Sequence, residues 1–276
     1  MKIALGQINP TIGDLDGNRR LVWDAALEAE RRGAALAIFP ELALTGYPPK
    51  DLLERPAFLD AARASLDALA AELGARGVRV GVLVGFPERL PPSPSGRGVS
   101  NSAALIEGGR VVSVTRKSLL PTYDVFDEWR YFDPATAVGV VPFRGQRLGV
   151  TICEDIWNDG DFWPQRLYRA DPVEALVAAG VRAGMLVGFP ERLPPAAEGR
   201  GVANSAALIE GGRVVSVTRK SLLPTYDVFD EWRYFDPATA VSVVPFRGRR
   251  LGVTICEDIW NDGDFWPKRL YRADPV

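Results

Sequence analysis

The sequence predicts an α/β fold in which short buried strands alternate with amphipathic helices. Residues 3–9 and 35–40 are short apolar runs that contain β-branched residues and are bounded by polar residues or proline, as expected for buried strands. Between them, residues 18–32 carry apolar side chains at helical spacing. The alternation indicates a sheet whose strands are covered by helices and buried on both faces.

The first predicted helix is followed by a second helix and a third strand. Asp14 or Asp16 is expected to cap the first helix, because an aspartate oxygen accepts hydrogen bonds from free N–H groups there. The pattern near residues 57–73 predicts the second helix, and residues 78–85 predict the strand that follows.

Two further elements carry polar residues of interest. Residues 102–117 form two apolar segments around the Gly108-Gly109 pair, which predicts a β-hairpin. Residues 147–157 predict a strand that enters a turn at Cys153.

The chain contains a long internal repeat. Residues 78–173 (the first copy) recur at 181–276 (the second copy) with a constant offset of 103 and no gaps. A unit of this length and identity differs from solenoid repeats, which span about 20–50 residues. It indicates either a duplication or two related gene copies joined by recombination or sequence assembly. The nine differing pairs are Val80/Ala183, Val82/Met185, Ser93/Ala196, Pro94/Ala197, Ser95/Glu198, Ser100/Ala203, Gly139/Ser242, Gln146/Arg249 and Gln165/Lys268.

Composition excludes several classes of function. The charges nearly balance, with 33 basic and 35 acidic residues, so neither nucleic acid nor a membrane surface is an expected partner. No signal-peptide pattern and no apolar run of about 18 residues occurs, so a cytoplasmic protein without membrane spans is expected. Two cysteines are too few for a disulfide framework.

The 276 residues include no histidine. This excludes Ser-His-Asp triads, Cys-His dyads and metal sites built on imidazole, and no metal is expected. Any general base must therefore be a carboxylate, a lysine or a tyrosine.

Three candidate catalytic residues follow predicted strands. Glu41 comes after residues 35–40, Lys117 ends the predicted hairpin, and Cys153 ends an apolar run. Taken singly, each residue type more often has a structural role than a catalytic one. A glutamate at such a position more often starts a helix, a lysine is more often solvated at a strand end, and a cysteine is more often an inert buried thiol. Together they are a sufficient catalytic set, in which the glutamate takes the thiol proton and the lysine supports an oxyanion. The lysine charge is also expected to favour the thiolate.

Three segments resemble known signature motifs. FPELALTGYPPKDLL (39–53), RKSLLPTYDVFDEWRYF (116–132) and GVTICEDIWN (149–158) are similar to those of the carbon–nitrogen hydrolase (nitrilase) superfamily. Their combination resembles the glutaminase domain of glutamine-dependent NAD⁺ synthetases. The resemblance runs from Met1 to about residue 180.

The resemblance implies a role for each matching residue. Glu41 is the general base, Lys117 the oxyanion-stabilising lysine and Cys153 the nucleophile. Tyr123 matches a position that contacts substrate glutamine, and Glu128 matches a second glutamate that orients the catalytic set. The implied reaction is hydrolysis of the L-glutamine amide. In the family, the ammonia passes to a synthetase domain that amidates deamido-NAD⁺ at the expense of ATP.

The chain departs from this family in its second half. The implied fold is a nitrilase-like αββα sandwich, which is incomplete here because residues 1–180 match only the N-terminal two-thirds of the glutaminase domain. Residues 181–276 repeat the middle segment instead. No pyrophosphate-binding loop of the synthetase type and no P-loop occurs. No cofactor is therefore expected in this chain, and ATP and deamido-NAD⁺ are expected only at the absent synthetase domain.

The second copy repeats Lys220, Tyr226, Glu231 and Cys256 but has no counterpart of Glu41. We therefore expect it to lack a general base, and the isolated chain to fold poorly or to be inactive. The two copies can also compete for the same N-terminal half.

Two other functions remain open. The first is a stand-alone carbon–nitrogen hydrolase acting on another small amide, against which Tyr123 and the DEWRYF stretch favour glutamine. The second is a non-catalytic degenerate fragment that serves in self-association, since superfamily members commonly form homo-oligomers.

Overall fold

The computed structural model consists of two compact units, which are described separately. The first comprises Met1–Val141, Val150–Asn158 and Tyr168–Leu176, and the second comprises Pro142–Gly149, Asp159–Leu167 and Val177–Val276. The residues that the structure describes are 1–94, 96–122, 127–156, 158, 168–181, 185–193, 199–210, 213–223, 225, 231–240, 243–246, 249–253 and 255.

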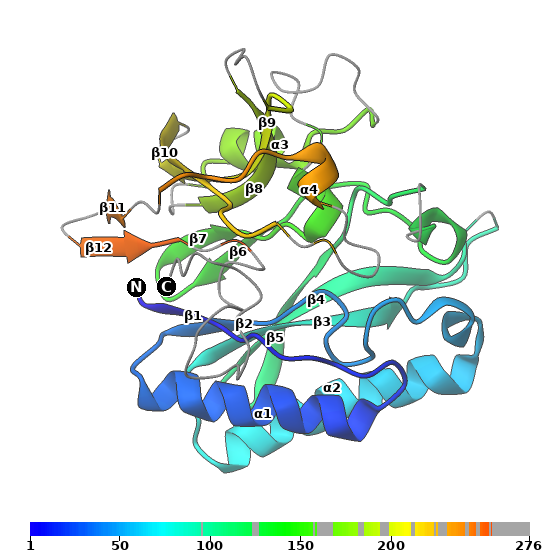
Figure 1. The fold of residues 1–276 in the computed structure, drawn as a ribbon. Helices are drawn as coiled ribbons and strands as arrows, with labels where there is room; N and C mark the ends of the chain where they lie inside the picture. Colours follow the sequence, from blue (N-terminus) through cyan, green and yellow to red (C-terminus); the bar gives the residue numbers. More distant parts are fainter. Residues whose placement is uncertain are drawn as a thin grey trace. The chain divides into compact units, whose positions relative to one another are not determined.

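A mixed five-stranded sheet forms the centre of the first unit (Figure 1). The first three strands run parallel, and the last three are successively antiparallel. The predicted strand at residues 3–9 is shorter than expected, since only three of its residues are in strand conformation. In sheet order the strands are β1 (Ile3–Leu5), β2 (Leu36–Ile38), β3 (Gly81–Arg89), β4 (Val99–Glu107) and β5 (Arg110–Arg116).

Two helices, α1 (Leu15–Arg31) and α2 (Pro56–Ala75), lie side by side along one face of this sheet (Figure 1). The Asp14 carboxylate accepts the Gly17 N–H at 2.9 Å, which confirms Asp14 as the cap of α1. Pro56 occupies the first position of α2, where the missing N–H costs no hydrogen bond. Both predicted helices are confirmed.

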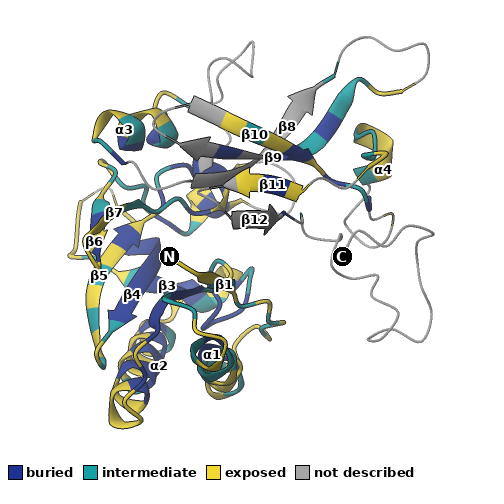
Figure 2. Cartoon of the chain, turned by 90° about the vertical axis from the view of Figure 1, so that its left-hand side faces the viewer, coloured by how far each residue is buried: buried dark blue, intermediate teal, exposed yellow. Residues whose placement is uncertain are grey.

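The main core lies between these helices and the sheet. Figure 2 shows the buried faces of α1 and α2 turned toward the strands and their exposed faces turned away. Each fully buried aliphatic side chain contributes about 1.5–3 kcal/mol relative to exposure. The core includes Val22 and Ala26 of α1, Leu66, Leu69 and Leu73 of α2, and Val82, Val84, Phe86, Ala104 and Ile106 of the sheet.

The predicted hairpin is confirmed as the pair β4–β5. Gly108 and Gly109 form its turn with φ angles of +57° and +81°, which glycine adopts without a steric penalty. The turn packs tightly on the end of α2, because a Cβ added at Gly74 would lie 2.7 Å from the Cα of Gly109. The strand β4 is buried along its length except for its last residue, whereas the edge strand β5 alternates between buried or half-buried and exposed residues.

The predicted strand that leads into Cys153 is shorter than expected, whereas the predicted turn at Cys153 is confirmed. The chain forms β6 (Val140–Phe143) and β7 (Gln146–Gly149), which pair in a two-stranded sheet, and then leaves strand conformation before Cys153. Cys153 begins a short 3₁₀ segment, Cys153–Ile156. A further short helix, α3, spans Pro172–Ala178.

The second unit contains a three-stranded antiparallel sheet, in the order β10-β9-β8, that repeats the β3–β5 arrangement. Phe189 of β8 pairs with Ser205 of β9, as Phe86 pairs with Ser102 in the first unit. Across the described parts of the chain, no helix is both long and apolar enough to cross a membrane. The remaining elements are β8 (Met185–Arg192), β9 (Val202–Glu210), β10 (Arg213–Arg219), α4 (Glu231–Tyr234), β11 (Val243–Phe246) and β12 (Arg249–Gly252).

Candidate active site

A fully buried lysine joins two carboxylates in the first unit. Lys117 directly follows β5 and has no solvent exposure. Its Nζ lies 2.7 Å from Oε1 of Glu41, and 2.9 and 2.8 Å from the two carboxylate oxygens of Glu128. An ammonium has three N–H donors, so these three contacts use all of them.

The loop that follows β2 places Glu41 against the sheet at Gly85. A Cβ at Gly85 would lie only 2.2 Å from the backbone nitrogen of Leu42, so any larger residue would push the loop away. Leu44 donates its N–H to the Gly85 carbonyl at 3.1 Å and ties the loop to β3. The sequence therefore fixes the position of Glu41 partly through a glycine on the neighbouring strand.

Two further polar residues, Asn101 and Tyr47, complete the cluster. The Asn101 side-chain N–H group donates to Glu41 at 2.6 Å and to Glu128 at 3.3 Å. The Tyr47 hydroxyl donates to Glu128 at 2.8 Å. Sequence reasoning missed both residues. The available signals were an amide between two serines, next to the apolar run at residues 103–106, and a tyrosine six residues after Glu41.

The charged groups in this cluster shift one another's pKa values. Burial alone would lower the pKa of Lys117, but attraction by Glu41, Cys153 and Glu128 outweighs it and raises that pKa. Burial, followed by repulsion from Glu41, raises the pKa of Glu128 even though Lys117 opposes the shift. Burial and the neighbouring Glu128 raise the pKa of Tyr47, so this phenol stays protonated and keeps donating.

Cys153 and Glu41 line the same cavity, whose volume is about 180 Å³. Its walls include apolar Ile38 of β2 and Leu83 of β3. Cys153 is accessible and has a φ of +45°, in the left-handed region that side chains other than glycine rarely adopt. Such a conformation costs on the order of 1–3 kcal/mol and persists where surrounding contacts enforce it, commonly at functional sites.

The expectation that the lysine charge favours the Cys153 thiolate holds for Lys117 itself, whose charge lowers the pKa of the thiol, but other effects reverse the net shift. Although Cys153 is accessible, the protein around its sulfur takes water from it, and this loss of solvation, followed by the charge of Glu41, raises the pKa of the thiol. The charge of Glu128 adds to this shift, so the attraction by Lys117 only partly offsets it. Cys153 at rest is therefore a thiol, which would need a base in order to attack a substrate.

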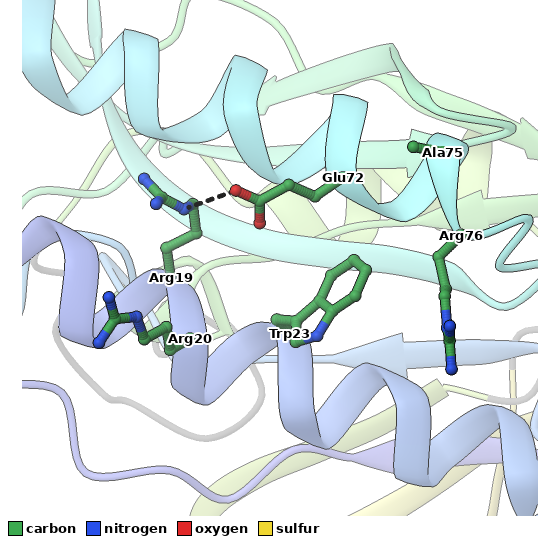
Figure 3. Close-up of a pocket in the computed structure, with 6 residues that line it drawn as sticks. All are labelled: Arg19, Arg20, Trp23, Glu72, Ala75 and Arg76. Atoms are coloured by element: carbon green, nitrogen blue, oxygen red, sulfur yellow. Dashed lines mark ion pairs between the residues drawn. The ribbon is translucent and has the colours of Figure 1, made fainter.

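A larger hollow of about 610 Å³ lies between α1 and α2 and carries no nucleophile (Figure 3). An ion pair between Arg19 and Glu72 at 3.4 Å crosses it. Among the described residues its lining has no thiol, whereas Cys153 and Glu41 line the smaller cavity, so the smaller cavity is the candidate for amide chemistry. The residues around the larger hollow are Arg19, Arg20, Trp23, Glu72, Ala75 and Arg76.

The structure describes only some of the residues predicted for the second copy. In the second unit, Lys220 donates to both carboxylate oxygens of Glu231 at 2.8 Å, and Asn204 contacts the same carboxylate at 3.4 Å. Tyr123, Tyr226 and Cys256 lie outside the residues that the structure describes.

Several proteins are similar to this chain. The glutamine-dependent NAD⁺ synthetase of Synechocystis sp. is 44% identical over 181 residues, which are 65% of this chain and 32% of that protein. That of Thermotoga maritima is 44% identical over 158 residues, 57% of this chain and 26% of that protein. The chain thus spans about a third or less of the length of these relatives.

Solved structures show the same fold. The glutamine-dependent NAD⁺ synthetase of Acinetobacter baumannii superposes with a TM-score of 0.55 at 25% identity, covering 79% of this chain and 43% of that one. An amidase of the nitrilase superfamily from Nesterenkonia AN1 superposes with a TM-score of 0.54 at 21% identity, covering 79% of this chain and 86% of that one. These matches agree with the mixed α/β, nitrilase-like fold that the sequence predicts.

The family assignment rests on the sequence model of the carbon–nitrogen hydrolases. That model matches residues 2–170, which is more than half of the chain and includes Glu41, Lys117, Glu128 and Cys153. The chain therefore belongs to the carbon–nitrogen hydrolase family.

Proposed function

We propose that the first unit hydrolyses the side-chain amide of L-glutamine and releases ammonia, as the glutaminase part of glutamine-dependent NAD⁺ synthesis. The observation that carries this proposal is the buried Lys117 held between Glu41 and Glu128, with Glu41 lining the same cavity as Cys153. A thiol, a carboxylate base and an ammonium are together sufficient for acyl transfer without histidine.

In the first step, Cys153 is acylated. Glu41 takes the thiol proton as sulfur attacks the amide carbon, since the raised pKa of Cys153 keeps the resting thiol protonated. The carbonyl π electrons move to oxygen and form a tetrahedral oxyanion. Its collapse breaks the C–N bond, the proton on Glu41 passes to the departing nitrogen, and ammonia and a γ-glutamyl thioester result.

Lys117 is the proposed stabiliser of that oxyanion. In the resting site, however, its N–H donors are already occupied. All three of its N–H donors face carboxylates, two of them on Glu128. One donor must leave Glu128 to reach an oxyanion. Tyr47 and Asn101 still hydrogen-bond Glu128 after that exchange, so the carboxylate is not left unsatisfied.

In the second step, water releases glutamate. Glu41 removes a proton from water, the hydroxide attacks the thioester carbon, and the C–S bond breaks. The leaving thiolate takes the proton from Glu41, so the thiol and the ionised base are regenerated. No cofactor takes part in either step. The ATP-dependent amidation of deamido-NAD⁺ is proposed for a separate synthetase domain.

The choice of glutamine as the substrate rests on the relatives of this chain and on the size of the cavity. The Synechocystis and Thermotoga relatives are glutamine-dependent enzymes. A cavity of about 180 Å³ is smaller than the roughly 300–1,000 Å³ of pockets for drug-sized ligands, so a small amide is the appropriate class of substrate. Tyr123 stays a proposed glutamine contact.

The test measures alkylation of Cys153 as well as turnover, because alkylation requires only the assembled residues of the first unit. The protein is incubated with a diazoketone analogue of glutamine, and each cysteine is followed by peptide mass spectrometry. We expect alkylation of Cys153, abolished in Cys153→Ala and lowered about 10²–10⁴-fold in Glu41→Gln, as for loss of a general base. Cys256→Ala is the matched control and should leave labelling of Cys153 unchanged.

A substrate panel separates glutamine from the alternatives. Release of ammonia from simple amides or ureido acids, in preference to glutamine, would replace the proposal with a stand-alone hydrolase. Labelling of neither cysteine, and no hydrolysis of any amide by folded protein, would replace it with the inactive, non-catalytic chain that is expected from the sequence.

A further inference from the structure

Asp155 connects the turn that carries Cys153 to the chain that follows Lys117. One carboxylate oxygen accepts the N–H groups of Ser118 and Leu119, both at 2.8 Å. The other accepts the N–H of Ile152 at 3.0 Å. The side chain is almost completely buried, so water does not compete for these three hydrogen bonds.

The same residue closes a clasp around Cys153. Ile152 precedes Cys153 and donates to the Asp155 carboxylate, while the Asp155 backbone N–H donates back to the Ile152 carbonyl at 3.1 Å. Cys153 lies between them with its φ of +45°. These two bonds hold the backbone in the conformation that a non-glycine residue would otherwise leave.

The connection also fixes the distance between two parts of the candidate site. Ser118 and Leu119 directly follow Lys117, whose side chain holds Glu41 and Glu128. Three hydrogen bonds to one charged carboxylate are stronger than the same number between neutral groups. A displacement of Cys153 relative to Glu41 therefore requires that at least one of them break.

We propose that Asp155 is a positioning residue that holds Cys153 at a fixed position relative to the Glu41–Lys117–Glu128 cluster. It acts through the backbone and does not line the cavity. The inference rests on the proposed function for the reaction that it serves, but the geometry of the clasp does not depend on which amide is cleaved.

Asp133 provides a matched control in the same unit. Its carboxylate accepts the backbone N–H groups of Arg97 and Gly98 at 2.9 and 2.8 Å, but it ties the loop between β3 and β4 and does not contact the cluster. Asp155→Asn and Asp133→Asn each put an amide in place of a carboxylate that accepts several backbone N–H groups. Both variants are made in the Cys256→Ala protein, so that Cys153 is the remaining thiol.

Two measurements at Cys153 test the proposal. The first is labelling by the glutamine diazoketone, and we expect about a 100-fold loss of rate in Asp155→Asn, the size expected when a reacting group is misplaced by about 1 Å. The second is alkylation by iodoacetamide from pH 6 to 10. Release of the turn lets water reach the thiol and takes it away from Glu41, and these two effects outweigh the loss of the Lys117 charge, so the midpoint of alkylation should move to lower pH. Asp133→Asn should change neither readout.

Slower labelling by the diazoketone, combined with alkylation by iodoacetamide at lower pH, distinguishes a positioning role from general destabilisation. A rate of diazoketone labelling and an alkylation midpoint in Asp155→Asn equal to those of Asp133→Asn would refute the proposal. If the parent protein is not labelled by the diazoketone at all, the proposed function fails, while the alkylation profile still decides the role of Asp155. If Asp155→Asn does not fold, Asp155→Glu, which keeps the charge and displaces it, is judged by the same two criteria.

Discussion

The two copies of the repeat build the same local contacts in different surroundings. Asp133 accepts two backbone N–H groups at the β3–β4 loop, and Asp236 does the same for Arg200 and Gly201 in the second unit. The lysine–glutamate pair also recurs, with closest distances of 2.8 Å for Lys117–Glu128 and for Lys220–Glu231. These contacts lie within one copy, so 96 residues are sufficient to specify them.

The copies differ where contacts must come from outside the repeat. Glu41 and Tyr47 belong to residues 1–77 and complete the cluster around Lys117 and Glu128. The side chain of Glu128 is 2% exposed, whereas that of Glu231 is 18% exposed. The lysine–glutamate pair is therefore a property of the repeated sequence, while residues 1–77 contribute Glu41 and Tyr47 to the cluster that encloses Glu128.

The largest expected difference follows from removing the lysine of each copy. Lys117→Met leaves two carboxylates near each other in a buried site, and breaking a buried ion pair in this way costs about 3–5 kcal/mol. Lys220→Met leaves Glu231 partly exposed, so its cost should be smaller, on the order of 1–2 kcal/mol. Hydrogen exchange of β4 and β9 measures each copy separately, because Ser100 and Ala203 give their peptides different masses.

The stabilisation of the first copy by Lys117 is also expected to depend on pH. Because the pKa of folded Lys117 is raised, its stabilisation is complete below the unfolded value of about 10.4 and is lost as pH rises beyond it. The difference in opening free energy of β4 between the parent protein and Lys117→Met should therefore stay constant from pH 7 to 9. It should shrink above about pH 10.5. A difference that shrinks instead between pH 7 and 9 would contradict the raised pKa.

A smaller effect is expected from Tyr47→Phe, which removes a contact that only the first copy has. Hydrogen bonds to charged groups contribute about 1.5–3 kcal/mol, and Glu128 keeps its bonds to Lys117 and Asn101 in this variant. We expect β4 to lose stability by that amount and β9 to be unchanged, as measured by hydrogen exchange of the same two peptides. Equal losses in both copies would show that Tyr47 does not act through Glu128.

The local elements of the fold could be predicted from the sequence, but the closure of the site could not. Apolar periodicity located α1, α2 and the β4–β5 hairpin, and Asp14 was one of two expected caps. The contacts of Tyr47 and Asn101 with Glu128 span 81 and 27 residues, and no local pattern encodes such pairings. The favourable effect of the Lys117 charge on the Cys153 thiolate could be predicted, but the net rise of the thiol pKa could not, because the loss of solvation around the sulfur and the charge of Glu41 depend on the tertiary structure.

The smallest expected effect tests a contact that the two copies share. Arg97 lies 5.2 Å from the ring centroid of Trp129, and Arg200 lies 5.1 Å from that of Trp232. Both tryptophans are about half exposed, and a cation–π pair at an exposed site contributes about 0.5–1 kcal/mol. Trp129→Leu and Trp232→Leu should therefore destabilise their own copies by the same small amount, as measured from the β4 and β9 peptides. A clearly larger loss for Trp129→Leu would mean that residues 1–77 reinforce this contact as well, and that the repeated sequence specifies less of its own structure than the matching distances indicate.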